Sequence, residues 1–427
     1  MMDYPIWHGS IPMEVFIEHK LRAERLLVEG NGIRVRDQTG RWYIDARSSC
    51  WNLGLGYSAE RVKEAIRQQL DKLPNANILS YDRPAQVTLD YARALRDAIA
   101  SPTLRYVRLG NTGSQMTETA VMLSRLARVI GGEPERHLVL AFEGSYHGLG
   151  IGACALSGIT ARIDFCGPLA PGMHHVPAQG SWTGNIRQAL DELSAERVTA
   201  VIFEPQMGSM GLLPEADDLR ALASLCREAG VHLIADEVTT GCGRTGGMSR
   251  TLDLGVEPDM LVLGKNLTSG YVPFAALMVS AELYRLAANP DPPRFLPAGS
   301  ATDGHPVACA AGLAVLDTYE RDDILAHVRQ TGAVLRERLE TVHAKWIAEG
   351  SVAGAGLMIH FPLLRAGGAP WSFPDLGAFR TDCENNGLLV SASMRGMWVV
   401  PPLTTTEDDC AEIASIFDQV LAQGGAA

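Results

Sequence analysis

Val231-His232-Leu233-Ile234-Ala235-Asp236 and Met260-Leu261-Val262-Leu263-Gly264-Lys265 are the two stretches that decide the fold. Each is a short apolar run that ends in a charged residue. Continuous runs of this length are typical of strands that are buried on both faces of a parallel sheet. Similar runs at residues 106–109, 138–142 and 198–203 alternate with helical stretches. The alternation predicts a largely parallel sheet that is covered by helices.

The two ends of the chain have a different rhythm. Residues 32–44 alternate apolar and polar side chains around a turn, which predicts a hairpin, and Ser58 can cap a helix that runs to about Leu73. The C-terminal part predicts further elements, namely helices at 307–320 and 334–346, strands at 357–361 and 388–390, and a helix from about 407. We therefore expect an α/β fold with a large, mostly parallel-sheet domain at residues 59–305. A smaller α+β domain would combine an N-terminal segment, residues 1–58, with residues 306–427.

The composition disfavours several kinds of partner. The 427 residues carry a formal net charge of −12, and Lys and Arg do not cluster, so nucleic acid is not an expected partner. No run of about 18 apolar residues and no signal peptide occur, so we expect no membrane contact and a cytoplasmic location. The cysteines lack metal-binding spacing, so we expect no metal site and thiols that are reduced and mostly buried. They are Cys50, Cys154, Cys166, Cys226, Cys242, Cys309, Cys383 and Cys410.

The residues that follow the predicted strands are the candidate site, because ligands of parallel sheets bind beyond the carboxyl ends of the strands. The first strand is followed by Gly110-Asn111-Thr112-Gly113-Ser114, a loop of small residues before a helix that starts near Gln115. Free backbone N–H groups at such a helix start suit a phosphate. Taken alone, a loop of this kind is more often a simple connection between strand and helix.

Two charged residues at strand ends carry the chemistry. A carboxylate at the rim of a buried strand needs a cationic partner, and for Asp236 a protonated pyridine nitrogen would serve. Alternatively, Asp236 caps a helix or forms a buried salt bridge. Lys265 becomes a nucleophile if burial lowers the pKa of its amine, although most lysines simply reach solvent. Tyr146 and Val238 could pack on opposite faces of a flat ring, or belong to the ordinary core. Taken together, these residues favour a site that binds an aromatic cofactor.

The chain resembles the class III aminotransferases, which are fold type I enzymes dependent on pyridoxal 5'-phosphate (PLP), over nearly its whole length. The resemblance rests on segments that occur in the family's order and spacing, namely Ile234–Gly246, Leu263–Leu267, Phe142–Gly148, Glu204-Pro205 and Gly304–Ala310. It implies PLP as the cofactor. It also implies a homodimer with the active site at the subunit interface.

The resemblance also implies a role for individual residues. Lys265 would hold PLP as a Schiff base and move a proton, and Asp236 would bind the pyridine nitrogen. The full set of expected cofactor-binding residues is Gly113, Ser114, Tyr146, His147, Glu204, Asp236, Val238, Lys265 and Thr302. Thr302 is included because Ala301 stands where relatives have a threonine that reaches the partner's phosphate, and Thr302 or Ser300 beside it could replace that threonine. Trp51 would line the substrate pocket. Ser391 stands in place of an arginine that clamps a substrate carboxylate, so either Arg395 takes over that role or the substrate needs no carboxylate ligand.

The reaction implied by the resemblance is a ping-pong transamination. An amino donor converts PLP to pyridoxamine phosphate, which then aminates a ketone or aldehyde acceptor. An aminomutase or racemase on the same scaffold is an alternative, and a PLP-binding protein without turnover is another. A nicotinamide-dependent enzyme is disfavoured because no G-x-G-x-x-G follows the first strand. The sequence does not specify which amine or carbonyl compound is used.

Overall fold

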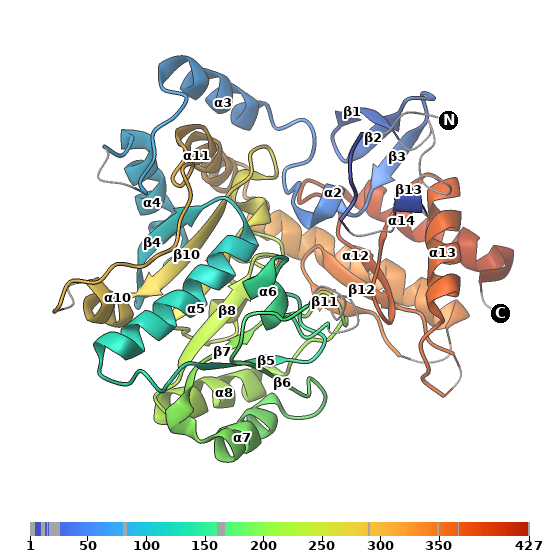
Figure 1. Cartoon of the computed structure of the whole chain (residues 1–427). Coiled ribbons are helices and arrows are strands. Elements are labelled where there is room, and N and C mark those ends of the chain that lie inside the picture. Colours follow the sequence, from blue (N-terminus) through green and yellow to red (C-terminus); the bar gives the residue numbers. More distant parts are fainter. Residues whose placement is uncertain are drawn as a thin grey trace.

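The computed structural model describes residues 5–9, 13–14, 16, 26–79, 83–159, 167–288, 291–347, 350–365 and 367–425. At its centre lies a seven-stranded sheet (Figure 1). In spatial order its strands are β4 (Leu104–Gly110), β10 (Ala275–Ser280), β9 (Met260–Leu263), β8 (His232–Glu237), β7 (Val198–Phe203), β5 (Leu138–Phe142) and β6 (Met173–Val176). Strands β9, β8, β7, β5 and β6 pair in parallel, whereas β10 runs antiparallel to both of its neighbours. The predicted, mostly parallel sheet is confirmed.

Helices cover both faces of this sheet because its strands alternate their side chains between two apolar layers. Leu140 and Phe142 of β5 belong to one layer, whereas Val139 and Ala141 belong to the other. The first layer is completed by α4 (Gln86–Ile99), α7 (Trp182–Leu193) and α8 (Ala216–Glu228). The second is completed by α5 (Gly113–Ile130) and α10 (Ala281–Ala288). Figure 1 shows α5 lying across the sheet.

Two smaller sheets lie beside the large one. The first has the order β1 (Leu27–Asn31), β2 (Arg34–Asp37), β3 (Trp42–Asp45) and β13 (Leu388–Leu389). The second has the order β11 (Ala353–Ala355), β12 (Met358–Pro362), β15 (Gly396–Val399) and β14 (Ser391–Ala392). The parallel pairing of β3 with β13 joins the N-terminal hairpin to the C-terminal part, as the proposed small domain requires. The boundaries at 58 and 305 stay a prediction.

The remaining helices connect and cover these sheets (Figure 1). They are α2 (Ser48–Trp51), α3 (Glu60–Lys72), α6 (Ile151–Leu156), α9 (Arg250–Asp253), α11 (Pro306–Arg321), α12 (Ile324–Trp346), α13 (Phe373–Asn385) and α14 (Glu407–Val420). Helix α11 packs against α3 and α4, and α12 packs against α14. Within the described part of the chain, no helix is long and apolar enough to cross a membrane.

Three local expectations need correction. The helix after the hairpin begins at Glu60, and the Ser58 hydroxyl does not cap it but accepts a hydrogen bond from the N–H of Gly32 at 2.9 Å. The helix predicted at 334–346 begins ten residues earlier, at Ile324. Strand β10 was missed, because an apolar run rich in alanine does not distinguish a buried strand from a helix. Of the cysteines, Cys166 lies outside the described residues; the other seven are free thiols, and all of them except Cys50 and Cys154 are buried.

Candidate active site

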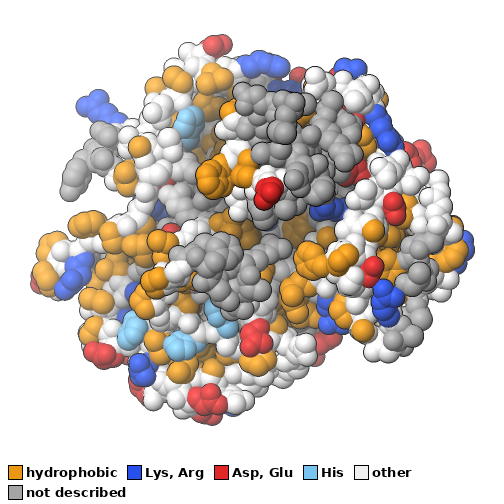
Figure 2. Space-filling view, turned by 45° about the vertical axis from the view of Figure 1, so that its right-hand side comes forward, with side chains coloured by type: hydrophobic (Ala, Val, Ile, Leu, Met, Phe, Trp, Pro, Cys, Tyr) orange, Lys and Arg blue, Asp and Glu red, His pale blue; other side chains and the backbone are white. Residues whose placement is uncertain are grey.

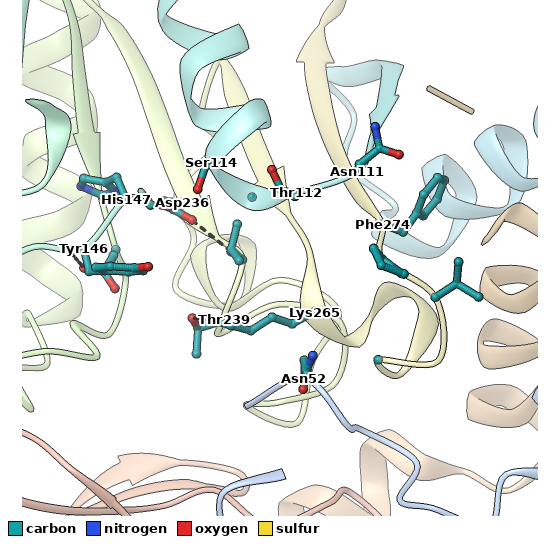
Figure 3. A pocket seen from close by; sticks show the side chains of 17 residues that line it. Asn52, Asn111, Thr112, Ser114, Tyr146, His147, Asp236, Thr239, Lys265 and Phe274 are labelled. Atoms are coloured by element: carbon teal, nitrogen blue, oxygen red, sulfur yellow. Dashed lines mark hydrogen bonds and ion pairs between the residues drawn. The ribbon is translucent and has the colours of Figure 1, made fainter. Parts of the chain in front are cut away.

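A cavity of about 320 Å³ lies beyond the carboxyl ends of the central strands. All the predicted cofactor-binding residues except Thr302 line it, and it also includes Asn52, Asn111, Thr112, Thr239 and Phe274. The parallel pairing of β8 with β9 brings the two charged strand ends together, because Asp236 lies opposite Val262 and Lys265 follows two residues after β9 ends. Figure 3 shows Ser114 and Thr112 at the start of α5 on one side of the cavity and Lys265 on another.

The start of α5 forms a cradle of backbone N–H groups and hydroxyls. Thr112 is the N-cap, and its hydroxyl accepts a hydrogen bond from the N–H of Gln115 at 3.2 Å. A Cβ atom on Gly113 would come within 2.9 Å of the Val238 side chain, so this position excludes larger residues. The Ser114 hydroxyl accepts the N–H of Leu149 at 3.0 Å and keeps its own proton to donate. Such an arrangement suits an anion with several oxygen atoms.

Asp236 is buried and held by two hydrogen-bonding groups. Its Oδ2 lies 2.8 Å from Nδ1 of His147, and its Oδ1 accepts the N–H of Val238 at 3.1 Å. No Lys or Arg pairs with Asp236 among the residues that the structure describes. The carboxylate is therefore oriented by its neighbours, and within the described chain no Lys or Arg compensates the cost of burying it.

Glu204 is a second buried carboxyl of the cavity, with 6% of its surface exposed. It accepts the N–H of Tyr146 at 2.9 Å and the N–H of Gly208 at 3.3 Å. Burial, with a smaller contribution from the nearby Asp236, raises the pKa of Glu204 to about 7 against the lowering effects of His147 and of the two N–H groups. At neutral pH the side chain therefore exists in both protonation states. Tyr146 keeps 41% of its surface exposed, so its ring is accessible to a ligand.

Lys265 follows β9 in a left-handed backbone conformation with φ 42°. Burial lowers the pKa of its amine, which increases the neutral, nucleophilic fraction. The amine donates a hydrogen bond to the Thr239 hydroxyl, toward which Lys265 extends in Figure 3, and forms no ion pair with a described residue. Its nitrogen also lies 5.6 Å from the centre of the Trp51 ring. The sequence singled out Lys265 but not Thr239 as a site residue, although Thr239 lies three residues after Asp236.

Three predicted site residues, Trp51, Thr302 and Arg395, lie outside the cavity lining, although the Trp51 ring lies near the Lys265 nitrogen. The hydroxyl of Thr302 donates to Oδ1 of Asn111 at 3.1 Å, so it reaches a lining residue and not the cavity itself. Arg395 lies between β14 and β15, and its main chain is fixed by the Ser393 hydroxyl. The roles of Thr302 with the partner's phosphate and of Arg395 with a substrate carboxylate stay predictions. No group of three or more possible metal ligands occurs in the described part of the chain.

Comparisons with known proteins identify the family of the chain. The sequence model of the family "Aminotransferase class-III" matches residues 18–421. An omega-aminotransferase from Caulobacter vibrioides is 29% identical over 437 residues, covering 98% of this chain and 97% of its own. The PLP-bound structure of an amine transaminase from an uncultivated Pseudomonas species shares 28% identity, covers 99% of both chains and has a TM-score of 0.93. The omega transaminase from Pseudomonas jessenii, solved with PMP, has a TM-score of 0.91 at 26% identity, covering 98% of this chain and 96% of that one.

The fold and the cavity thus define a PLP-dependent transferase. The chain belongs to the class III aminotransferase family. It is a PLP-dependent aminotransferase, whose substrates are small molecules. The expectations for fold, cofactor and enzyme class are confirmed, and no comparison supports the alternative of an aminomutase or racemase.

The residues present fit PLP. The start of α5 offers donors for a phosphate, and Asp236 carries a buried negative charge that a pyridinium nitrogen would neutralise. Lys265 has a buried amine without a carboxylate partner in the described chain. When bound, PLP supplies an aldehyde for the amino group and an electron-withdrawing ring.

Proposed function

We propose that Lys265 is the catalytic base of the transamination and that Asp236 is the second catalytic residue, which would bind the pyridine nitrogen of the cofactor. The observation that carries the proposal is the adjacency of β8 and β9, which brings an acidic and a basic group to one cavity. A lysine with a lowered pKa releases a proton more readily than an ordinary lysine and can take it back. Asp236, ionised, would keep the ring nitrogen protonated.

The other cofactor contacts follow from the placement of the cavity residues. Gly113 and Ser114 would hold the phosphate with the N–H groups of α5 and the serine hydroxyl. Tyr146 would cover one face of the ring and Val238 the other, because both line the cavity near Asp236. His147 and Glu204 would act through their neighbours, by orienting Asp236 and the main chain of Tyr146.

A homodimer with the active site at its interface also belongs to this proposal. Large apolar side chains are exposed beside the cavity, including Leu149 and Ile151, which are 62% and 69% exposed. Exposed groups of this kind commonly mark contact surfaces. On the face drawn in Figure 2, Lys and Arg are scattered among acidic and apolar side chains, which offers no basic field for nucleic acid. A cytoplasmic location remains part of the proposal.

Replacing Lys265 tests the assignment. We expect Lys265→Ala to lose the visible absorption of lysine-bound PLP and all measurable turnover, while its circular dichroism stays like that of the wild type. Lys345→Ala is the matched control, because this exposed lysine pairs with Asp418 far from the cavity lining. A Lys265→Ala protein that kept both the absorption and the turnover would refute the proposal.

A further inference from the structure

Trp51 reaches the site from an unusual piece of backbone. Ser48, Ser49 and Trp51 all have positive φ angles, of 46°, 61° and 63°, in a region that residues with side chains rarely adopt. Specific contacts keep the segment in place. The Ser48 hydroxyl donates to the carbonyl of Val400 at 2.6 Å, and the N–H of Ser49 donates to the Asp45 carboxylate at 2.6 Å. Strain that is held in this way commonly serves a functional site.

The indole of Trp51 fits into a slot with three sides. Its N–H donates a hydrogen bond of 3.0 Å to the Ser391 hydroxyl, although 340 positions separate the two residues. The Trp398 ring meets it edge-on, with ring centres 5.7 Å apart. The third side is the main chain of Gly208, where a Cβ atom would lie only 2.7 Å from the indole ring.

The slot is itself built from one strand pair. Ser391 of β14 lies directly opposite Trp398 of β15, so the hydrogen-bond acceptor and the packing ring come from neighbouring positions of one small sheet. The indole N–H of Trp398 donates to the carbonyl of Gly208 at 2.5 Å. This hydrogen bond holds the Trp398 ring and the Gly208 main chain, two sides of the slot, together. The indole of Trp51 can therefore leave its place only if the bond to Ser391 breaks.

We propose that Ser391 is a positioning residue that holds the Trp51 indole as a wall beside Lys265 and thereby limits the size of the groups on the reacting carbon of the substrate. The indole lies 5.6 Å from the Lys265 nitrogen, which leaves little room for bulky substituents on that side. The inference rests on the proposed role of Lys265. It adds that the small sheet of β14 and β15 determines which substrates react at Lys265, which follows a strand of the large sheet.

Removing the hydroxyl of Ser391 should loosen the wall. In Ser391→Ala the indole N–H loses its acceptor at a partly buried place, so orientations that face water become favourable. The space beside Lys265 then admits larger groups, whereas small substrates lose a close contact. One or two methylene groups in an apolar pocket change discrimination by about 10-fold or more. Ser391→Ala should therefore raise the ratio of the rate for large substrates to the rate for small substrates.

The test uses two simple amines with the holoenzyme. 2-Aminopropane and 3-aminopentane differ by one methylene on each side of the reacting carbon, and single-turnover loss of the visible absorption gives the rate for each. We expect the ratio of the 3-aminopentane rate to the 2-aminopropane rate to rise about 10-fold in Ser391→Ala. Ser391→Thr keeps the hydroxyl acceptor and should retain the wild-type ratio.

A second background shows whether the effect passes through Trp51. Trp51→Phe has no indole N–H, so Ser391→Ala should change the ratio in the wild type but add almost nothing in Trp51→Phe. If Ser391→Ala fails to bind PLP, Trp51→Phe alone carries the test, because it too must raise the ratio.

The outcomes separate the two proposals. If neither amine reacts with wild-type holoenzyme that binds PLP through Lys265, the proposed role of Lys265 in amine chemistry fails. If the wild type reacts but Ser391→Ala keeps its ratio, or Ser391→Thr behaves like Ser391→Ala, the positioning role of Ser391 is overturned. Equal effects of Ser391→Ala with and without the indole would overturn it as well.

Discussion

The Nδ1 atom of His147 lies 2.8 Å from Oδ2 of Asp236, although 89 positions separate the two residues in the sequence. The histidine side chain is fully buried, and its Nε2 has no partner among the described residues. A donor at Nδ1 fixes the direction of the carboxylate. This contact makes His147 the side chain that orients the Asp236 carboxylate.

Replacing His147 should therefore weaken the binding of PLP. We expect His147→Ala to raise the dissociation constant of PLP about 10-fold to 100-fold, because a charge-assisted hydrogen bond contributes about 1.5–3 kcal/mol. His147→Asn keeps an N–H near the position of Nδ1, so its dissociation constant for PLP should lie between those of the wild type and His147→Ala. Absorbance titration of the apoenzyme with PLP measures both. The control is His343→Asn, another buried histidine, which bonds the carbonyl of Pro362 away from the cavity. Wild-type affinity in His147→Ala would contradict the prediction.

Glu204 should make the stability of the protein depend on pH. Its pKa is raised to about 7 in the folded chain, so the side chain favours folding below about pH 4.5 and this contribution is lost as the pH rises through 7. Glu204→Gln removes the charge. We expect the variant to match the wild type in unfolding free energy near pH 4.5 and to exceed it by up to about 3 kcal/mol at pH 8.

Urea unfolding of the apoenzyme at several pH values measures this difference for Glu204. Glu337→Gln, which changes an exposed carboxyl of α12, controls for the loss of one charge. If the difference in unfolding free energy between wild type and Glu204→Gln stays constant from pH 4.5 to pH 8, burial does not raise the pKa of the Glu204 carboxyl.

Arg244 should stabilise the contact between the large and small sheets. It is fully buried, and its Nη1 donates to the carbonyls of Leu357 at 3.1 Å and Pro401 at 2.5 Å. Arg244→Met leaves both carbonyls without this donor, and we expect the unfolding free energy to fall by about 3 kcal/mol. Arg336→Met, at an exposed position, should change it little. Denaturant unfolding measures this change in free energy. An unchanged midpoint for Arg244→Met would contradict the stabilising role of Arg244.

The sequence by itself determined the strands that carry the chemistry. The runs before Asp236 and Lys265 are continuous and apolar, a local pattern that marks a buried strand and shows where it ends. Since parallel strands end at one edge of their sheet, the strand ends already implied one shared site. The resemblance to the family then identified PLP. Trp51, Thr302 and Arg395, which no strand end fixes, are the predicted residues that do not line the cavity.

Only the tertiary structure decided how the site residues are held. The bond from Trp51 to Ser391 joins residues near opposite ends of the chain, and no sequence pattern signals such a pair. The raised pKa of Glu204 follows from burial by surrounding segments, and the antiparallel place of β10 follows from its pairing with β4 and β9. Strand type and position depend on neighbouring residues, whereas orientation and protonation depend on contacts that form only when distant parts of the chain pack together.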